Sequence, residues 1–558
     1  MLQSGIVTVK HTKIVGLWGA CGLLGIFVLR LFLSAPLQSV TFDEYAHVPA
    51  GYSYWRTGNF SLYSKNPPLI KLWFTLPLII TSPQLDFDPS QRNIHPWAVG
   101  FSFLKDNLSR YHAIFLQCRA MVILLSVFLG LMLFLWTRAL YGWMPALLCL
   151  FLYTFCPEIL AHSQLCTTDI GGALFLISAL AGLWFYLRKP TAKKSVVCGI
   201  LLGGAQLAKF SNLVLYFIYP LVLIAFLRKR DLRKSILVII LIFIVSVFVI
   251  NIGYFFQGTL RPLGTYTFTS NLMKSAQEAL PGHLPVPFPS SFVEGFDLNR
   301  YEVEIGHLFY LNGHLSLKSR WYYFLEAFTL KTPIPFLLLI FYRAFINPST
   351  THPHSFSAGS IFLIASVVFL ANFSFFTSLD IGVRYILPIF PLLSLWMSPV
   401  VLRMTTMWKK ILFGFLLVWY AAGSLSIHPH YLSYFNEIAG GPDGGHRYLG
   451  DSNIDWGQDL PQLKKYMDAH GLSRIKLFYY GVVDPEVYGI SYDFPLGEGP
   501  SSLKGDIAVS VSFLQGKGIW SVPTLKGRYL SVREGALIWL NRFQHAGRAG
   551  YSIYIFHL

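Results

Sequence analysis

Charged residues are scarce in this sequence. Only 13% of the 558 residues are Asp, Glu, Lys or Arg, whereas 54% are hydrophobic and the mean hydropathy is +0.51. A soluble domain needs more charge than this to cover its surface, so the composition excludes a soluble globular protein. Cysteine is also rare, and the six cysteines all lie in or beside apolar stretches, which argues against a disulfide framework.

Long hydrophobic runs are abundant instead, and they predict a polytopic membrane protein. Eleven stretches are long enough, or nearly so, to cross a hydrocarbon core of about 30 Å. They are residues 14–34, 112–136, 144–160, 170–187, 195–208, 211–227, 235–255, 324–346, 357–376, 383–402 and 409–426. We therefore predict an all-α transmembrane domain over 1–426, with outer loops at 35–111 and 256–323. The apolar stretch 69–80 is too short to span and is typical of an interfacial or re-entrant segment.

The polar tail, 427–558, is predicted to form a small α/β domain. Residues 460–470 have the spacing of a helix that ends at Gly471. Three segments have the pattern of strands: 475–480, 507–513 and 552–556.

Basic residues cluster in alternate connections between the predicted spans, for example at 188–194 and 228–234. The positive-inside rule then places the amino terminus in the cytoplasm and the tail outside. Much of the net charge of +17 is thus a signal of topology and of contact with membrane lipids, and we expect no nucleic-acid partner.

The unusual charges lie on the outer side, at the ends of several spans. They are Asp43 and Glu44, Lys65, Asp169, Lys209, Lys331 and Arg384. Ionisable groups at membrane depth are costly and usually face a wet cavity or each other. The pattern therefore predicts one shared cavity at the outer leaflet.

The chemistry of this set fits a substrate with a lipid tail and an anionic head. The cations Lys65, Lys209, Lys331 and Arg384 could hold a phosphate and stabilise it as a leaving group. Asp43 could accept a proton from an incoming hydroxyl. These parts describe glycosyl transfer from a polyprenyl-phosphate-linked sugar, although a flippase, a transporter or a non-catalytic binder of lipid-linked sugars would use similar groups.

Plainer roles stay open for the same residues. Asp43, Glu44 and Asp169 could act at helix N-termini, and Arg384 could pair with Asp380 four residues earlier. Lys209 and Lys331 could extend to the interface, where their ammonium groups stay hydrated. Asp43, Glu44 and Asp169 could also hold a divalent cation, but nothing in their spacing requires a metal.

Several motifs, in this order, resemble the dolichyl-phosphate-mannose protein mannosyltransferase family and its bacterial relatives. They are Asp43-Glu44, Lys65-Asn66-Pro67-Pro68-Leu69, Ala161-His162 leading to Thr168-Asp169, Trp321-Tyr322-Tyr323-Phe324 with Lys331-Thr332-Pro333, Gly382-Val383-Arg384-Tyr385, and the run from Tyr448 to Leu460. The resemblance covers nearly the whole chain. The 256–323 loop is too short for the folded insert of eukaryotic members, which favours a bacterial-type enzyme related to the aminoarabinose transferases.

The resemblance implies a GT-C fold and an inverting, hexosyltransferase-like activity with a polyprenyl-phosphate sugar donor. In it, the first acid of the pair, Asp43, is the catalytic base, and Glu44 supports the base or the acceptor. Lys65 would lie near the donor phosphate. Apart from the resemblance, the position of Asp169 makes it a candidate to contact the acceptor or a metal. The acceptor could be protein, lipid or polysaccharide. The enzyme would lie in a bacterial inner membrane, with its active site facing the periplasm or the cell exterior.

Overall fold

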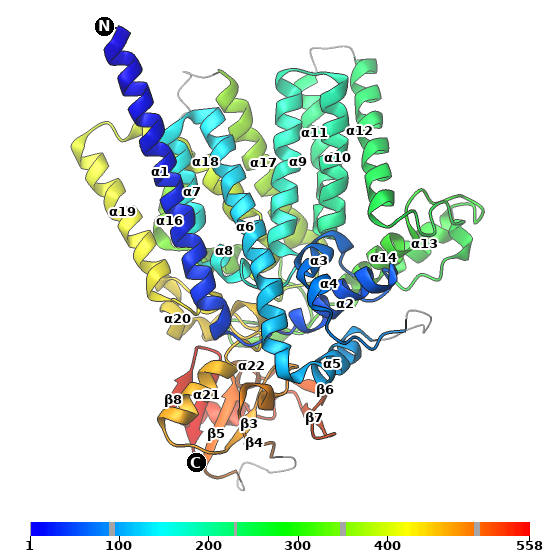
Figure 1. Ribbon diagram of the computed structural model, residues 1–558, viewed down its shortest axis with the longest axis vertical. Helices are drawn as coiled ribbons and strands as arrows, with labels where there is room; N and C mark the ends of the chain where they lie inside the picture. The colour runs from blue at the N-terminus through cyan, green and yellow to red at the C-terminus, as the bar shows by residue number, and fades with distance from the viewer. Residues whose placement is uncertain (1, 89–94, 228–231, 346–352, 496–502) are drawn as a thin grey trace.

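The computed structural model describes residues 2–88, 95–227, 232–345, 353–495 and 503–558. Most of the chain is helical, and Figure 1 shows the long helices packed side by side, with the sheet of the tail below one end of the bundle. The long helices are α1 Leu2–Ser34, α6 Tyr111–Tyr141, α9 Asp169–Arg188, α10 Ala192–Ala208, α12 Leu232–Gly253, α17 Pro353–Phe376 and α19 Met407–Ser426.

Five helices in the described residues are long and apolar enough to cross a membrane, so the protein is an integral membrane protein. They are Lys13–Leu37, Leu108–Tyr141, Asp169–Arg188, Ile236–Gly253 and Ala358–Phe376. A sixth is added if the pair α15 Tyr323–Lys331 and α16 Ile334–Phe345, bent by 113°, counts as one span. The total of eleven stays a prediction.

Prolines explain why several predicted spans are not continuous helices. The stretch 144–160 divides into α7 Trp143–Thr154 and α8 Pro157–His162, because the residue before a proline is pushed toward extended backbone and Cys156 is extended there. Thr332, before Pro333, is extended at the α15–α16 bend in the same way. Two further predicted spans contain the short helices α11 Leu215–Leu227 and α18 Ile389–Met397. A 3₁₀ turn precedes α11, and α18 lies between two 3₁₀ turns.

The two outer loops form short helices that lie across the end of the bundle (Figure 1). In the first loop these are α2 Glu44–Thr57, α3 Pro68–Phe74, α4 Leu76–Thr81 and α5 Pro96–Asp106. The second holds α13 Asn271–Ala279, α14 Ser290–Ile305 and the hairpin β1 Phe309–Leu311 with β2 His314–Ser316. The apolar stretch 69–80 is split between α3 and α4, and neither is long enough to span.

The tail contains a mixed five-stranded sheet in the order β4-β3-β5-β9-β8, in which β3 is parallel to β4 and β5 and the other pairs are antiparallel. Its elements are α20 Gly441–Gly444, α21 Leu460–Ala469, β3 Ile475–Phe478, β4 Tyr492–Asp493, β5 Asp506–Ser510, α22 Val511–Leu514, β6 Ile519–Pro523, β7 Tyr529–Val532, β8 Gly547–Ala549 and β9 Ile553–His557. The predicted helix corresponds to α21, and the predicted strands 475–480 and 552–556 correspond to β3 and β9. The third predicted strand, 507–513, is right only as far as Ser510, where β5 ends, because Val511–Leu514 forms α22. One buried apolar cluster runs from Phe27 in α1 to Phe556 in β9, so the tail packs directly on the helical part.

Candidate active site

A cavity of about 1010 Å³ lies where the outer loops, the ends of the membrane helices and the tail meet. This is at the upper end of the size range of small-molecule sites. Its charged lining includes Asp43, Lys65, Asp169, Lys209, Arg384 and Asp451, and much of the remaining lining is aromatic or aliphatic. We call it the membrane cavity.

Arg384 joins the two acids of this cavity. Its Nη1 donates to Asp43 Oδ2 at 2.7 Å and lies 3.9 Å from Asp169 Oδ2. Asp169 also pairs with Lys209 and accepts a hydrogen bond of 2.7 Å from Thr167 Oγ1. Arg384 Nε is buried and has no hydrogen-bond partner within the described part of the chain. The guanidinium therefore keeps an unused donor beside two carboxylates and a lysine.

Helix ends place these side chains, but the acids do not cap the helices. Asp43 occupies the N-cap position of α2, and its carboxylate makes no capping bond, because it pairs with Arg384 instead. Asp169 is the first residue of α9. Lys209 follows the last residue of α10, at the start of the 3₁₀ turn Phe210–Val214.

The tail holds the backbone that carries Arg384, which lies in the 3₁₀ turn Val383–Ile386. Asn453 Oδ1 accepts a bond of 2.9 Å from Val383 N, and Ser452 Oγ donates to Ile381 O at 2.7 Å. A Cβ on Gly382 would lie 2.1 Å from Ser452 Oγ, so this approach requires glycine. Trp456 completes the support, with its ring 4.3 Å from the Arg384 guanidinium carbon.

The surroundings of Asp43 suit a proton acceptor. Its side chain is 16% exposed and lines the membrane cavity. Burial raises the pKa of the Asp43 carboxyl, and the Arg384 guanidinium acts against this, leaving the pKa above its ordinary value. Asp43 thus combines access to the cavity with a strengthened affinity for a proton.

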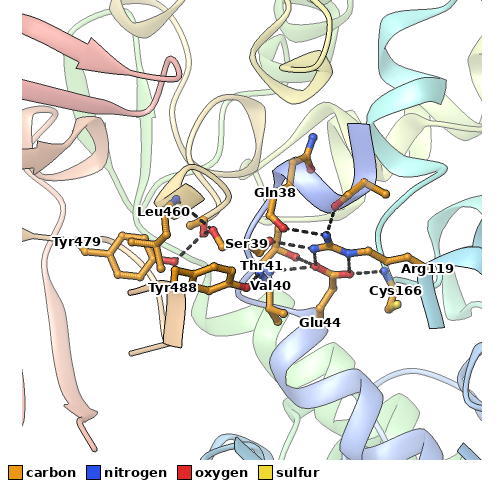
Figure 2. A network of polar contacts seen from close by, with 12 residues as sticks. Gln38, Ser39, Val40, Thr41, Glu44, Arg119, Cys166, Leu460, Tyr479 and Tyr488 are labelled. Carbon is orange, nitrogen blue, oxygen red and sulfur yellow. Dashed lines mark hydrogen bonds and ion pairs between the residues drawn. The ribbon is translucent and has the colours of Figure 1, made fainter. Parts of the chain in front are cut away.

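Glu44, the second acid of the pair, has a different setting (Figure 2). It is fully buried and is not among the residues that line the membrane cavity. Arg119 donates to both of its oxygens, at 2.9 and 2.7 Å, and backbone N–H groups of Thr41 and Cys166 add bonds of 3.0 and 2.9 Å. Burial raises the pKa of Glu44, but Arg119 and these bonds outweigh it and hold the pKa below its ordinary value.

Arg119 extends this network to the end of the first span. It donates to the carbonyl oxygens of Ala35, Gln38 and Ser39 at 2.7 to 3.0 Å. Figure 2 shows that Ser39 and Val40 in turn contact Leu460 and Tyr488 of the tail. The Glu44–Arg119 pair therefore fixes the start of the loop that presents Asp43.

Lys331, predicted to hold the donor phosphate, is likewise not brought into the membrane cavity. Its ammonium is fully buried and lies 3.1 Å from Glu158 Oε1. It also donates to the carbonyl oxygens of Leu432 and Asn453, each at 2.7 Å. These three acceptors direct Lys331 toward the tail, so its position indicates a structural role.

Lys65 does line the membrane cavity and is half-buried there. It pairs with Glu302 of α14, which joins the two outer loops across the cavity. Asp380 does not take the alternative role of partner to Arg384, since its Oδ2 accepts the backbone N–H of Arg320 at 2.7 Å.

Several lining residues were not among those predicted for the site. Asp451 reaches the cavity from the tail and pairs with the buried Lys517, and Tyr480 lies beside them. Aromatic residues of the first outer loop also line the cavity. Among them are Tyr63 and Trp97, whose ring centroids lie 5.3 Å apart. The richness of that loop in aromatic residues was a signal, but nothing in the sequence assigns Lys517 to the site.

The three carboxylates proposed as metal ligands are each engaged by a cation: Asp43 by Arg384, Asp169 by Lys209 and Glu44 by Arg119. Across the residues that the structure describes, no group of three or more His, Cys, Asp or Glu side chains gathers to form a metal site.

Residues 112–254, which include Arg119, Asp169 and Lys209, match the model of a known protein family. The matching model is that of the dolichyl-phosphate-mannose-protein mannosyltransferase family, so this segment is similar to that family. The match agrees, over this segment, with the family resemblance that the motifs indicated. We call residues 112–254 the mannosyltransferase segment. It runs from α6 to α12 and contains Asp169 and Lys209 of the cluster around Arg384.

Comparison with solved structures gives remote likenesses. ArnT from Cupriavidus metallidurans bound to undecaprenyl phosphate is 13% identical, with a TM-score of 0.47 and coverage of 96% of each chain. Apo ArnT from the same organism is 15% identical over 78% of this chain and 70% of its own, with a TM-score of 0.44. The oligosaccharyltransferase of Archaeoglobus fulgidus is 13% identical over 92% of this chain and 73% of its own, with a TM-score of 0.42. No curated protein matches the sequence significantly.

Proposed function

We propose that the protein is an inverting glycosyltransferase that moves one sugar from a polyprenyl-phosphate donor to an acceptor on the extracytoplasmic face of the membrane. One observation carries the proposal. A cavity-facing carboxylate with a raised pKa, Asp43, lies in the same cavity as Arg384, Lys209 and Lys65. The mannosyltransferase segment, 112–254, supports the same class of reaction.

The acid and the cations divide the reaction between them. Asp43 takes the proton from the acceptor hydroxyl or amine as its oxygen or nitrogen attacks the anomeric carbon. The bond from that carbon to the phosphate oxygen breaks, and the polyprenyl phosphate leaves with the electron pair. A positioned base typically contributes about 10²–10⁴-fold to the rate.

The phosphate is assigned to the cations on the cavity wall. Arg384 offers its unpartnered Nε, and Lys209 and Lys65 add positive charge on the same cavity. Each would stabilise the charge that develops on the leaving phosphate, and loss of one such donor costs about 10²–10³-fold in rate. Asp169 keeps Lys209 and Arg384 in place through its ion pairs, and its place in the lining of the same cavity puts it near the acceptor.

Glu44 and Lys331 take supporting roles in this proposal. Glu44 anchors the turn that presents Asp43, and Lys331 binds backbone carbonyls of the tail. Neither lines the cavity, so neither is expected to contact the donor or acceptor.

Donor consumption by the purified protein in lipid tests the proposal. A panel of radiolabelled polyprenyl-phosphate sugars is offered with envelope acceptors to the wild type, Asp43→Asn and Asp86→Asn. Asp86 is an exposed acid of the same outer loop and serves as the matched control. We expect sugar to leave one carrier with the wild type and Asp86→Asn, and the rate to fall at least about 100-fold with Asp43→Asn.

Three outcomes would contradict the proposal. If Asp43→Asn transfers sugar at the wild-type rate, Asp43 is not the base. If a carrier binds tightly to every variant and none is consumed, or if it moves between leaflets with its sugar intact, the protein is a binder or a flippase.

A further inference from the structure

A second cavity of about 730 Å³ lies in the tail, and none of its lining residues belongs to the membrane cavity. We call it the tail cavity. Its walls come from the turn of the β1–β2 hairpin, the α20 region, α22 and β9. The role proposed for the membrane cavity makes no use of this space.

The tail cavity carries basic groups with little acid. Arg447 and Arg548 both line it, and the single acid of the lining, Asp443, pairs with Arg548. Arg447 is exposed and contributes a further positive charge. Arginine forks bind phosphate and carboxylate groups through paired N–H donors, so this wall suits an anion.

An aromatic and imidazole surface lies beside the arginines. The Tyr554 ring lies 5.7 Å from the His446 ring and 5.1 Å from the His545 ring, and the Arg548 guanidinium carbon is 5.8 Å from it. Burial lowers the pKa of both His446 and His545, which leaves these imidazoles neutral near pH 7. A neutral imidazole can both donate and accept a hydrogen bond, as sugar hydroxyls do.

Two buried polar atoms of the same lining have no hydrogen-bond partner within the described part of the chain. They are Gln515 Oε1 and His446 Nδ1. Gln515 is only 7% exposed, and its Nε2 already donates to the carbonyls of His446 and Leu449 at 2.7 and 3.0 Å. Leaving a buried polar atom without a hydrogen bond costs about 1–3 kcal/mol. A polar ligand that bonded to either atom would recover part of this free energy.

We infer that the tail cavity binds an anionic saccharide, that is, a sugar bearing a phosphate or a carboxylate. Arg447 and Arg548 bind the anionic group, Gln515 Oε1 accepts a sugar hydroxyl, and Tyr554 packs against the ring. Both the anionic group and the hydroxyls are needed, because the cavity combines a charged wall with unpaired neutral acceptors. The inference is independent of sugar transfer in the membrane cavity.

Equilibrium binding to the full chain in lipid nanodiscs tests this site, with glucose 6-phosphate and glucuronate as probes and glucose and inorganic phosphate as partial ligands. We expect saturable binding of both anionic sugars, and about tenfold or greater weakening with Arg447→Gln or Arg548→Gln. Because Arg447 is exposed, Arg447→Gln is expected to fold normally. It can therefore still test the site if Arg548→Gln is unstable. The Asp43→Asn variant is expected to bind as the wild type does, which separates this site from the proposed activity.

Two matched controls locate the ligand. Arg474→Gln removes an exposed arginine elsewhere in the tail, and Lys65→Gln removes a cation of the membrane cavity. Both are expected to leave binding unchanged. Weakening by Lys65→Gln alone, no saturable binding of either anionic sugar, or equal binding of inorganic phosphate would each overturn the inference.

Discussion

Asp43 and Glu44 are neighbours in the chain, yet their side chains meet opposite surroundings. Successive residues at a helix start point about 100° apart. That difference sends Asp43 to the membrane cavity and Glu44 into the buried network around Arg119. Only the first of the two acids is accessible to a substrate.

Neutralising Glu44 should therefore affect stability more than chemistry. Glu44→Gln leaves Arg119 buried without its anionic partner, and breaking such a pair typically costs about 3–5 kcal/mol. We expect the unfolding midpoint in detergent to drop clearly for Glu44→Gln and little for Asp43→Asn. Equal midpoints for the two variants would contradict the structural role of Glu44.

The raised pKa of Asp43 predicts the acidic limb of the activity profile. A base works only when deprotonated, so transfer is lost as pH falls through the pKa of Asp43, and burial places this limb above the pH at which an ordinary Asp titrates. Arg384 lowers that pKa, and Arg384→Gln should therefore move the limb to higher pH. The profile of kcat/KM against pH measures this shift, and movement toward lower pH would contradict it.

Which ionisable residues share the cavity could be predicted in part. Asp43, Asp169, Lys209 and Arg384 all follow or begin apolar runs on one side, and position relative to a span is readable from sequence. The placement of Lys331 was not readable, because its direction depends on Glu158, which approaches from another helix.

At the scale of elements, proline marks where the helices depart from simple spans. The 113° bend between α15 and α16 turns a stretch that is continuous in hydropathy into two short helices. Hydropathy counts apolar residues and does not register that Thr332 precedes Pro333. The helix α21 was easier to predict from the sequence, because its periodicity is helical and Gly471 marks its end. In the structure Gly471 has a φ of 65°, which glycine adopts readily.

The 3₁₀ turn Asp451–Asn453 is the element on which the site most depends. Asn453 donates to Tyr323 Oη and Gly450 O, each at 2.9 Å, and accepts from Val383 N at 2.9 Å. These bonds connect the tail to α15 and to the turn that carries Arg384.

Asn453→Ala should weaken both folding and transfer. It leaves buried partners unsatisfied, at about 1–3 kcal/mol for each group, and releases the backbone of Arg384. We expect a lower unfolding midpoint and a lower kcat. Asn271→Ala, at an exposed position in α13, is the control, and an unchanged kcat for Asn453→Ala would show that the turn does not position Arg384.

On the scale of the whole molecule, the connection between α9 and α10 and the hairpin β6–β7 lie at opposite ends (Figure 1). The basic cluster at 188–194, which includes Lys193, occupies the end away from the membrane cavity. This separation agrees with the proposed orientation, in which the basic end faces the cytoplasm and the cavity and tail face outside.

Labelling of single cysteines tests that orientation. Lys193→Cys and Lys526→Cys place exposed thiols at the two ends, and the wild type, with its six native cysteines, gives the background. In intact cells, a membrane-impermeant thiol reagent should modify Lys526→Cys alone. After lysis it should modify both. The predicted orientation would be contradicted if both positions were labelled in intact cells, or if only Lys193→Cys were labelled.

The support of Arg384 by Trp456 and Asn453 also sets an order for biosynthesis. Asp43 leaves the ribosome early, whereas the residues that hold its partner arrive some four hundred positions later. No complete site exists until the tail has been made and has packed against the helices. A nascent or prematurely terminated chain would therefore occupy the membrane without the contacts that hold Arg384 in the membrane cavity.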